Sequence, residues 1–290
     1  MPRFDYNAPS TLDEVLALLT EHGDEGKVLA GGQSLIPLLS MRLAQPTQVV
    51  DINGVAGLDT IGAEGDTITF GATVRERQAE RSAVVAERLP LLAEALPHIG
   101  HVAIRTRGTV GGTVAHADAS AEIPCVVAAL DGEVLVRSSR GDRVIAAADF
   151  FQGHFTTAMD DDECLIEVRV PAQDPAAGYA FREIARRHGD FALVGVATTI
   201  TLGADGRITD SRIALMGMAD VPYRARAAEA ALVGAEPTLD TFTAAAETAI
   251  ADLSPASDVH GSAAFRSQLA RVTVRRALTT AGARARGESA

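Results

Sequence analysis

The sequence is poor in the residues that mark several classes of protein. It has no tryptophan and only 3 tyrosines among its 290 residues, so it lacks the aromatic surface on which single-stranded nucleic acids stack. Its net charge of −12 opposes binding to DNA or to an anionic membrane surface. The sequence shows no apolar run near the ~18 residues of a membrane span and no secretory signal pattern. We therefore expect a cytoplasmic protein without nucleic-acid partners or an integral membrane span.

Cysteine is also scarce, and the common catalytic motifs are missing. The two cysteines, Cys125 and Cys164, lie in apolar segments, and an iron–sulfur cluster usually needs four thiolates. Without an export signal a disulfide is not expected either, so we interpret both as buried thiols. His98 and His101 have no third ligand at a suitable spacing. Motifs for zinc hydrolysis, a serine-hydrolase elbow, a P-loop or a Rossmann fingerprint are lacking too. We predict no catalytic residues and no metal site in this chain.

Two short segments carry a glycine pair beside hydroxyl residues. They are residues 28–35 (VLAGGQSL) and residues 108–115 (GTVGGTVA), the first and second glycine segments below. A missing Cβ permits a tight turn and lets backbone N–H groups approach phosphate oxygens. Either segment alone is as consistent with an ordinary turn as with a phosphate site. The first segment is also expected between a strand and a helix, where a helix N-terminus can bind an anion. The two segments together predict a site at which both bind the pyrophosphate group of one dinucleotide, such as FAD.

The N-terminal half shows an alternating pattern of helices and strands. Thr11 and Glu14 have the spacing of a capping box, which predicts a helix that Gly23 ends. Strands are expected at 28–30 and 49–52, with a helix capped by Ser34 and extending to Leu43 between them. A hairpin turning at Gly65, a helix over 89–96 and a helix capped by Ser120 follow.

The C-terminal half predicts an α+β arrangement. Strands are expected at 133–137 and 164–170, and residues 171–178 (PAQDPAAG) are typical of a linker. Beyond it come three predicted strands and then Ala-rich helices, the order of an α+β fold. The three strands are residues 179–184, 192–202 and 208–216.

Several polar residues near these elements are further candidates. Asp118 and Glu122 follow the second glycine segment and could accept hydrogen bonds from a ribose or a flavin ring; alternatively, Ser120 and Glu122 only cap a helix. Arg182 is placed to meet a phosphate or another charged group. Phe191 is either an aromatic wall for a planar cofactor or part of a turn.

The glycine segments resemble a known family. Residues 30–37 (AGGQSLIP) with 109–112 (TVGG) are similar to the FAD-binding medium subunit of molybdenum hydroxylases. These are the flavoproteins of aerobic carbon monoxide dehydrogenase and the equivalent domain of xanthine dehydrogenase. Further matches follow in the expected order over nearly the whole chain: Arg42-Leu43, 49–52 (VVDI), 189–192 (GDFA), 256–258 (ASD), Phe265-Arg266 and 275–277 (RRA).

The resemblance implies a two-domain α+β protein that binds FAD non-covalently. Residues 1–176 would form a PCMH-type FAD-binding domain of two α/β subdomains. Residues 177–290 would form a C-terminal domain with a three-stranded antiparallel sheet and helices. The cofactor-binding residues carried over are Leu29, Ala30, Gly31, Gly32, Gln33, Ser34, Leu35, Ile99, Gly100, Thr109, Gly111, Gly112, Thr113, Asp118, Glu122, Leu165, Arg182 and Phe191.

The resemblance also implies an electron-transfer role. Electrons would come from [2Fe-2S] clusters in a small partner subunit, supplied in turn by molybdopterin in a large one, within a dimer of heterotrimers. The alternatives are a self-contained PCMH-type flavin oxidoreductase with its own small substrate, or a scaffold subunit that has lost its flavin. The intact glycine pairs argue against the scaffold. His116 is the only histidine close to a glycine segment, which weakens the case for a covalently tethered flavoenzyme.

Overall fold

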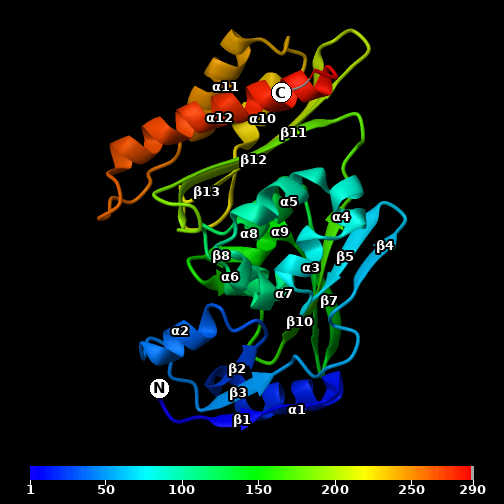
Figure 1. The fold of residues 1–290 in the computed structure, drawn as a ribbon, viewed down its shortest axis with the longest axis vertical. Helices are drawn as coiled ribbons and strands as arrows, with labels where there is room; N and C mark the ends of the chain where they lie inside the picture. The colour runs from blue at the N-terminus through cyan, green and yellow to red at the C-terminus, as the bar shows by residue number, and fades with distance from the viewer. Residues whose placement is uncertain (289–290) are drawn as a thin grey trace. The chain divides into compact units, whose positions relative to one another are not determined.

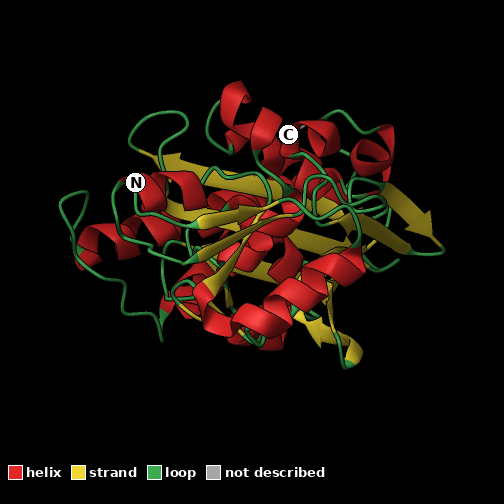
Figure 2. Cartoon of the chain, turned by 90° about the horizontal axis from the view of Figure 1, so that it is seen from below, coloured by secondary structure: helices red, strands yellow, loops and turns green. Residues whose placement is uncertain are grey.

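The computed structural model describes residues 1–288, which fall into two compact units. The first unit comprises Met1–Ser82, His101–Ala117 and Asp131–Pro171. The second comprises Ala83–Gly100, Asp118–Leu130 and the chain from Ala172 onward. Each unit is therefore assembled from separate stretches of sequence, and the linear boundary at residue 176 stays a prediction. Both helices and strands make up a large part of the chain (Figure 2), the mixed class that the sequence predicts.

The first unit begins with a small parallel sheet in the strand order β1-β3-β2. The helix α1 starts at a complete capping box, in which Thr11 and Glu14 each accept a hydrogen bond from the other's backbone, and ends at Gly23 as predicted. Val15, Leu16 and Leu19 form its buried face. The elements are β1 (Asp5–Asn7), α1 (Leu12–His22), β2 (Gly26–Leu29), α2 (Leu35–Ser40) and β3 (Gln48–Asp51).

A five-stranded antiparallel sheet forms the rest of the first unit, in the order β4-β5-β10-β6-β7. The predicted hairpin is present, with Gly65 at a φ of 56° in its turn. The helix α7 packs against β5 and β10 (Figure 1). The elements are β4 (Ile61–Glu64), β5 (Thr67–Gly71), α3 (Glu76–Glu80), α6 (Val102–Arg107), α7 (Val110–His116), β6 (Glu133–Ser138), β7 (Gly141–Ala146), α9 (Ala147–Phe150), β8 (Phe151–Gly153), β9 (Thr156–Thr157) and β10 (Cys164–Pro171).

The second unit is built on a four-stranded antiparallel sheet in the order β11-β12-β13-β14. The three predicted strands are confirmed and the two-residue β14 joins them. The long helix α12 lies along β11 and β12 (Figure 1) and, with α10 and α11, buries a core that includes Val194, Val196 and Phe242. The elements are α4 (Ala83–Arg88), α5 (Pro90–Ala95), α8 (Glu122–Ala129), β11 (Gly178–Ala185), β12 (Ala192–Leu202), β13 (Ile208–Met216), β14 (Tyr223–Arg224), α10 (Arg226–Leu232), α11 (Leu239–Ile250) and α12 (Ala263–Ala285).

Three local predictions are wrong. Ser34 precedes α2 but makes no capping hydrogen bond, and the helix ends at Ser40, which leaves Leu43 72% exposed. Ala121, not Ser120, is the N-cap of α8, because the Ser120 N–H is bound by the Asp118 carboxylate at 2.8 Å. The second glycine segment, for which the sequence suggested a turn, is helical: its glycine pair lies in the first turn of α7.

Candidate functional site

A cavity of about 980 Å³ in the first unit is lined by both glycine segments. Residues from 30–35 form one part of its wall and residues from 108–113 another. Further parts of the wall come from residues 24–28 and 43–47, from 155–157 around β9, and from the start of β10, where Leu165 lies. The volume is at the upper end of the range usual for small-molecule and cofactor sites. The two segments thus meet at one cavity, as the sequence predicts.

The first glycine segment is a loop at the end of β2. Gly32 has a φ of 73°, in the left-handed region that favours glycine. A Cβ on Gly31 would lie 2.5 Å from the Arg107 carbonyl oxygen and 2.8 Å from Gly108 Cα. The missing side chain at Gly31 therefore lets the first segment pack directly against the backbone that leads into the second.

The second glycine segment is the start of a capped helix. The Thr109 hydroxyl accepts the Gly112 N–H at 3.1 Å, which makes Thr109 the N-cap of α7. A Cβ on Gly111 would lie 2.6 Å from Ala72 Cα. The lack of a side chain at Gly111 is therefore required for packing of α7 on Ala72, and contact of this glycine pair with a ligand stays a prediction.

A polar network that the sequence does not reveal ties the two segments together. Asn53 Nδ2 donates to the Ala30 carbonyl at 2.8 Å. The Arg75 guanidinium donates to Asn53 Oδ1 and to the Arg107 carbonyl, both at 2.6 Å. Hydrogen bonds donated by a charged guanidinium are stronger than hydrogen bonds between neutral groups. The relative placement of the two segments is thereby fixed by side chains as well as by the Gly31 contact.

Glu76 also borders this cavity, and sequence reasoning missed it. Its side chain is 2% exposed, and the Thr113 hydroxyl donates to Oε1 at 2.7 Å. Burial raises the pKa of this carboxyl group to about 7, against the lowering effects of the Thr113 hydrogen bond and the Arg105 charge. Nothing in the local sequence marks Glu76, because its burial depends on pairing with Gly108, which is distant along the chain.

An aromatic pair lies at the cavity as well. The rings of His116 and Phe155 stack with centroids 4.8 Å apart and planes inclined at 26°. Phe155 has a φ of 55°, and its N–H donates to the Ala117 carbonyl at 3.2 Å. Its side chain is 53% exposed, so an apolar ring faces the opening where a flat ligand group can pack. The sequence prediction had placed the aromatic wall at Phe191 only.

The other predicted site residues have separate positions. Leu29 ends β2 and does not line the cavity. Six predicted cofactor-binding residues belong to the second unit, where Asp118 binds the Ser120 N–H, Glu122 is buried and Phe191 is 77% exposed. Their contact with a cofactor stays a prediction. These six are Ile99, Gly100, Asp118, Glu122, Arg182 and Phe191.

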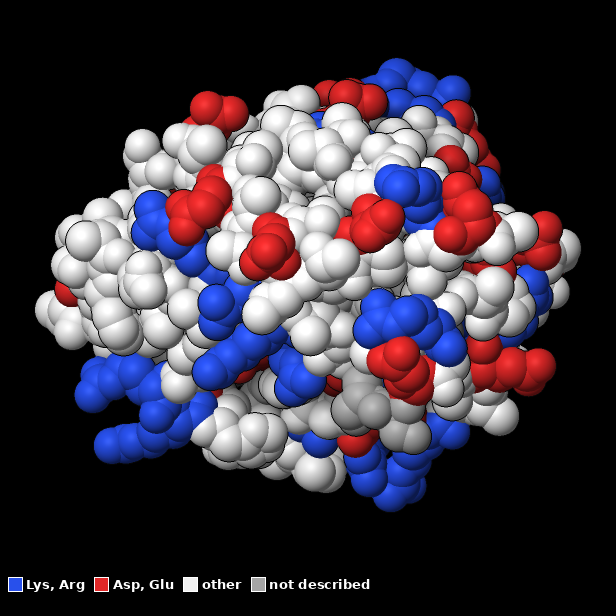
Figure 3. All heavy atoms as spheres, turned by 90° about the horizontal axis from the view of Figure 1, so that it is seen from above, with Lys and Arg blue, Asp and Glu red and all other residues white. Residues whose placement is uncertain are grey.

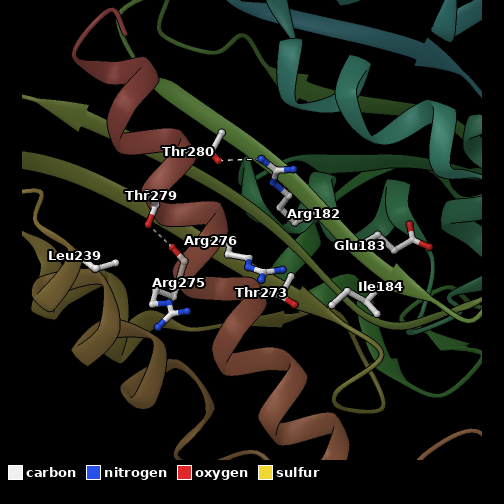
Figure 4. Close-up of a pocket in the computed structure, with 9 residues that line it drawn as sticks. All are labelled: Arg182, Glu183, Ile184, Leu239, Thr273, Arg275, Arg276, Thr279 and Thr280. Atoms are coloured by element: carbon white, nitrogen blue, oxygen red, sulfur yellow. Dashed lines mark hydrogen bonds between the residues drawn. The ribbon is translucent and has the colours of Figure 1, made fainter. Parts of the chain in front are cut away.

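Arg182 lies at a cavity of about 580 Å³ in the second unit (Figure 4). Its guanidinium donates to the Thr280 hydroxyl at 3.0 Å, joining β11 to α12. Arg275 and Arg276 line the same cavity, whereas Glu183 points away from Arg182 in this view.

On the molecular face in Figure 3, groups of basic and acidic side chains alternate, so neither sign covers that face.

The two cysteines are buried thiols in this structure. Cys125 and Cys164 are free and buried, as expected, and burial raises the pKa of both thiols to about 12. Within residues 1–288 no three His, Cys, Asp or Glu side chains are grouped to hold a metal ion. Over the same range no helix is long and apolar enough to cross a membrane.

The first cavity suits FAD by its donor chemistry. Backbone groups of the glycine segments and the Ser34 hydroxyl offer neutral hydrogen bonds, which suit a pyrophosphate. The Phe155 ring and the Leu35, Leu38 and Leu165 side chains offer apolar surface for a ring system. The wall is thus mixed in the way that a dinucleotide requires.

Comparison with known proteins agrees over both halves of the chain. The family model for the FAD binding domain in molybdopterin dehydrogenase matches residues 2–173, and that for the CO dehydrogenase flavoprotein C-terminal domain matches residues 179–281. The 6-hydroxypseudooxynicotine dehydrogenase complex subunit alpha of Paenarthrobacter nicotinovorans is 41% identical, covering 98% of this chain and 96% of that one. The carbon monoxide dehydrogenase medium chain of Hydrogenophaga pseudoflava is 37% identical, covering 98% of both chains.

Solved structures give the same answer. A structure of carbon monoxide dehydrogenase from Hydrogenophaga pseudoflava, which lacks the Mo-pyranopterin moiety of its cofactor, matches with a TM-score of 0.95 at 40% identity and 98% coverage of both chains. The relatives are named as subunits of dehydrogenases and the first family model is an FAD binding domain, so the resemblance seen in the sequence is confirmed. The chain therefore belongs to the flavoprotein family of molybdopterin dehydrogenases, as an FAD-containing electron-transfer subunit of the molybdenum hydroxylase type.

Proposed function

We propose that the cavity of the first unit is the FAD site, with the pyrophosphate on the two glycine segments. The observation that carries this proposal is the direct packing of Gly31 against Arg107 and Gly108, which brings both segments to one cavity wall. Two backbone segments held rigidly side by side can both donate to one anion without reorganisation. The residues proposed here are Ala30, Gly31, Gly32, Gln33, Ser34, Leu35, Thr109, Gly111, Gly112, Thr113 and Leu165.

The remaining predicted contacts are kept as part of this proposal. Leu29 supports the first segment, since its side chain lies beside Gly32. The six predicted residues of the second unit, from Ile99 to Phe191, are proposed as further cofactor contacts on the basis of the family resemblance. His116 and Phe155 are added as a stacked pair on the cavity wall.

Bound FAD supplies a redox group that takes up electrons singly and can release two at once. The chain's own residues bind and orient this group and exclude water from part of it, while the redox chemistry is the cofactor's. The partners we propose are a small subunit with [2Fe-2S] clusters and a large subunit with molybdopterin, in a dimer of heterotrimers. We expect this complex in the cytoplasm, where free thiols such as Cys125 and Cys164 stay reduced.

An obstructing substitution tests the cavity assignment. Ala115 lines the cavity, is exposed and lies within α7, so Ala115→Trp adds bulk to the cavity without entering the core. We expect the full chain to fold and to lose FAD, measured as flavin absorbance per protein after gel filtration. Ala103→Trp is the matched control, because Ala103 is exposed on α6 and does not line the cavity. Full flavin occupancy in the Ala115 variant would show that FAD binds elsewhere.

The assembly is tested separately on the complex from its native host. We expect a flavin spectrum overlaid by iron–sulfur absorption, with molybdenum and two further subunits present. A lone chain that carries flavin and oxidises a small substrate by itself would favour the self-contained flavoenzyme instead.

A further inference from the structure

Glu76 lies directly beneath the second glycine segment. Its backbone N–H donates to the Gly108 carbonyl at 3.0 Å, and Arg75 and Thr109 form an antiparallel bridge beside it. Oε1 accepts the Thr113 hydroxyl, whereas Oε2 is buried without a hydrogen-bond partner. A Cβ on Gly108 would clash with Oε2. The carboxyl group is thus enclosed by the same backbone that the proposed function assigns to the FAD pyrophosphate.

The surrounding charges do not neutralise this carboxyl group fully. The charge of Arg105, on α6, lowers the Glu76 pKa. Arg105 is 5% exposed and is hydrogen-bonded to Glu80, with Nε 2.9 Å from Oε2 and Nη2 3.4 Å from Oε1. Glu80 in turn also pairs with Arg77. From α7, only the Thr113 hydroxyl donates to Glu76 among the hydrogen bonds described. The other titratable residues around the cavity are Asp24, Glu25, Lys27, His116, Asp160, Asp161, Glu163 and Cys164.

An unpartnered buried carboxyl oxygen beside an anion site has two protonation states that interact differently with a bound anion. Ionised, Oε2 places a negative charge in a poorly solvated position next to the phosphate charges of a bound ligand. Protonated, the group is neutral and the repulsion is removed. Burial already raises the pKa of Glu76 to about 7, so the two states coexist near neutral pH, and a bound anion shifts the balance further toward the protonated one.

We propose that Glu76 is a proton-binding positioning residue of the FAD site, and that FAD binds with net proton uptake from solvent onto the Glu76 carboxylate. The new bond is an O–H bond on a carboxylate oxygen. No other bond is made or broken, and no electron moves. This inference rests on the proposed location of the pyrophosphate on the two glycine segments.

Binding of FAD to the full chain, prepared free of flavin, tests the proposal. We expect the Kd of wild-type protein to weaken about tenfold between pH 6 and pH 9, the factor produced when binding shifts the proton affinity of one carboxyl group by one pH unit. Calorimetry in buffers of different ionisation enthalpy should show net proton uptake at pH 8. Glu76→Gln keeps the shape and an acceptor for Thr113 but cannot ionise, so its Kd should stay constant and its proton uptake should vanish.

Two control substitutions test whether the pH dependence of FAD binding comes from Glu76 and not from another titratable residue. Glu64→Gln changes an exposed glutamate at the end of β4 and should keep the wild-type pH dependence. His116→Gln removes another titratable group of the cavity wall and should keep the weakening above pH 7. If Glu76→Gln does not fold, the wild-type calorimetry decides alone.

The outcomes separate this inference from the function on which it rests. Wild-type binding without proton uptake, or a Glu76→Gln protein that keeps the pH dependence, would overturn the role of Glu76 while leaving the FAD site in place. FAD binding that survives Ala115→Trp would instead remove the site itself, and the proton-binding role with it.

Discussion

The two glycine segments are alike in sequence and different in structure. The first is a loop whose Gly32 needs a positive φ, and its Ser34 makes no capping hydrogen bond. The second is the start of α7, with Thr109 as a true N-cap and Gly111 packed on Ala72. The same residue types therefore allow a loop with a positive φ in one place and close packing at the start of a helix in the other. A glycine pair by itself marks a need for space, and only the fold shows which neighbour fills that space.

The largest expected effect comes from filling the space at Gly111. Gly111→Val places side-chain atoms against the Ala72 backbone, which cannot rotate away, and overpacking of this kind costs about 3 kcal/mol. We expect the free energy of unfolding of the flavin-free chain to fall by that amount in urea titration, with loss of FAD. Gly54→Ala is the control, because its added Cβ meets only Pro9 oxygen at 3.4 Å. Unchanged stability of the Gly111 variant would contradict packing as the reason for this glycine.

A second difference is that the second segment covers a buried carboxyl group. The Glu76 pKa is raised from 4.5 to about 7 in the folded chain, so the folded state binds more protons than the unfolded state between these values. Stability is therefore highest below pH 4.5, falls as pH rises to about 7, and changes little above that through this group.

Glu76→Gln should remove the fall in folding stability that ionisation of Glu76 causes. We expect the variant without FAD to be more stable than wild type by about 3 kcal/mol at pH 8, from the size of the pKa shift, and equal to it near pH 4. Urea unfolding at both pH values measures the difference. A stabilisation that is the same at both values would mean that the substitution acts through packing, not through charge.

The sequence predicted elements whose signals are local. The capping box of α1, the Gly65 hairpin and the three long strands of the second unit depend on residues a few positions apart. The start of α7 was missed because two glycines have poor helix propensity, and its stability comes from Thr109 and from contact with Ala72, which is distant in sequence.

The candidate site, too, was predicted only where its residues form a local sequence pattern. The glycine segments carry a local pattern and were found. Glu76, Asn53 and Arg75 carry none, because each acquires its role from a partner on another segment. Phe155 lies in a turn whose conformation depends on the Ala117 carbonyl. Such residues become visible only when the chain is folded.

The capping difference gives a smaller prediction. Thr109→Ala removes the hydroxyl that holds the Gly112 N–H, and loss of an N-cap costs about 1 kcal/mol. We expect this loss in the flavin-free chain, measured as a lower midpoint of urea unfolding. Thr109→Ser should restore most of it, because serine supplies the same acceptor.

Ser34→Ala is expected to have the smallest effect on the free chain, within about 0.5 kcal/mol, because the Ser34 hydroxyl makes no capping bond. Its effect should appear only with FAD present, as a roughly tenfold weaker Kd from the loss of one hydrogen bond to a charged oxygen. Comparing Thr109→Ala with Ser34→Ala thus separates a hydroxyl that stabilises the fold from one that is free to bind the ligand. Equal destabilisation of the flavin-free chain by both would show that the two segments are equivalent caps, and that their difference in the structure has no energetic consequence.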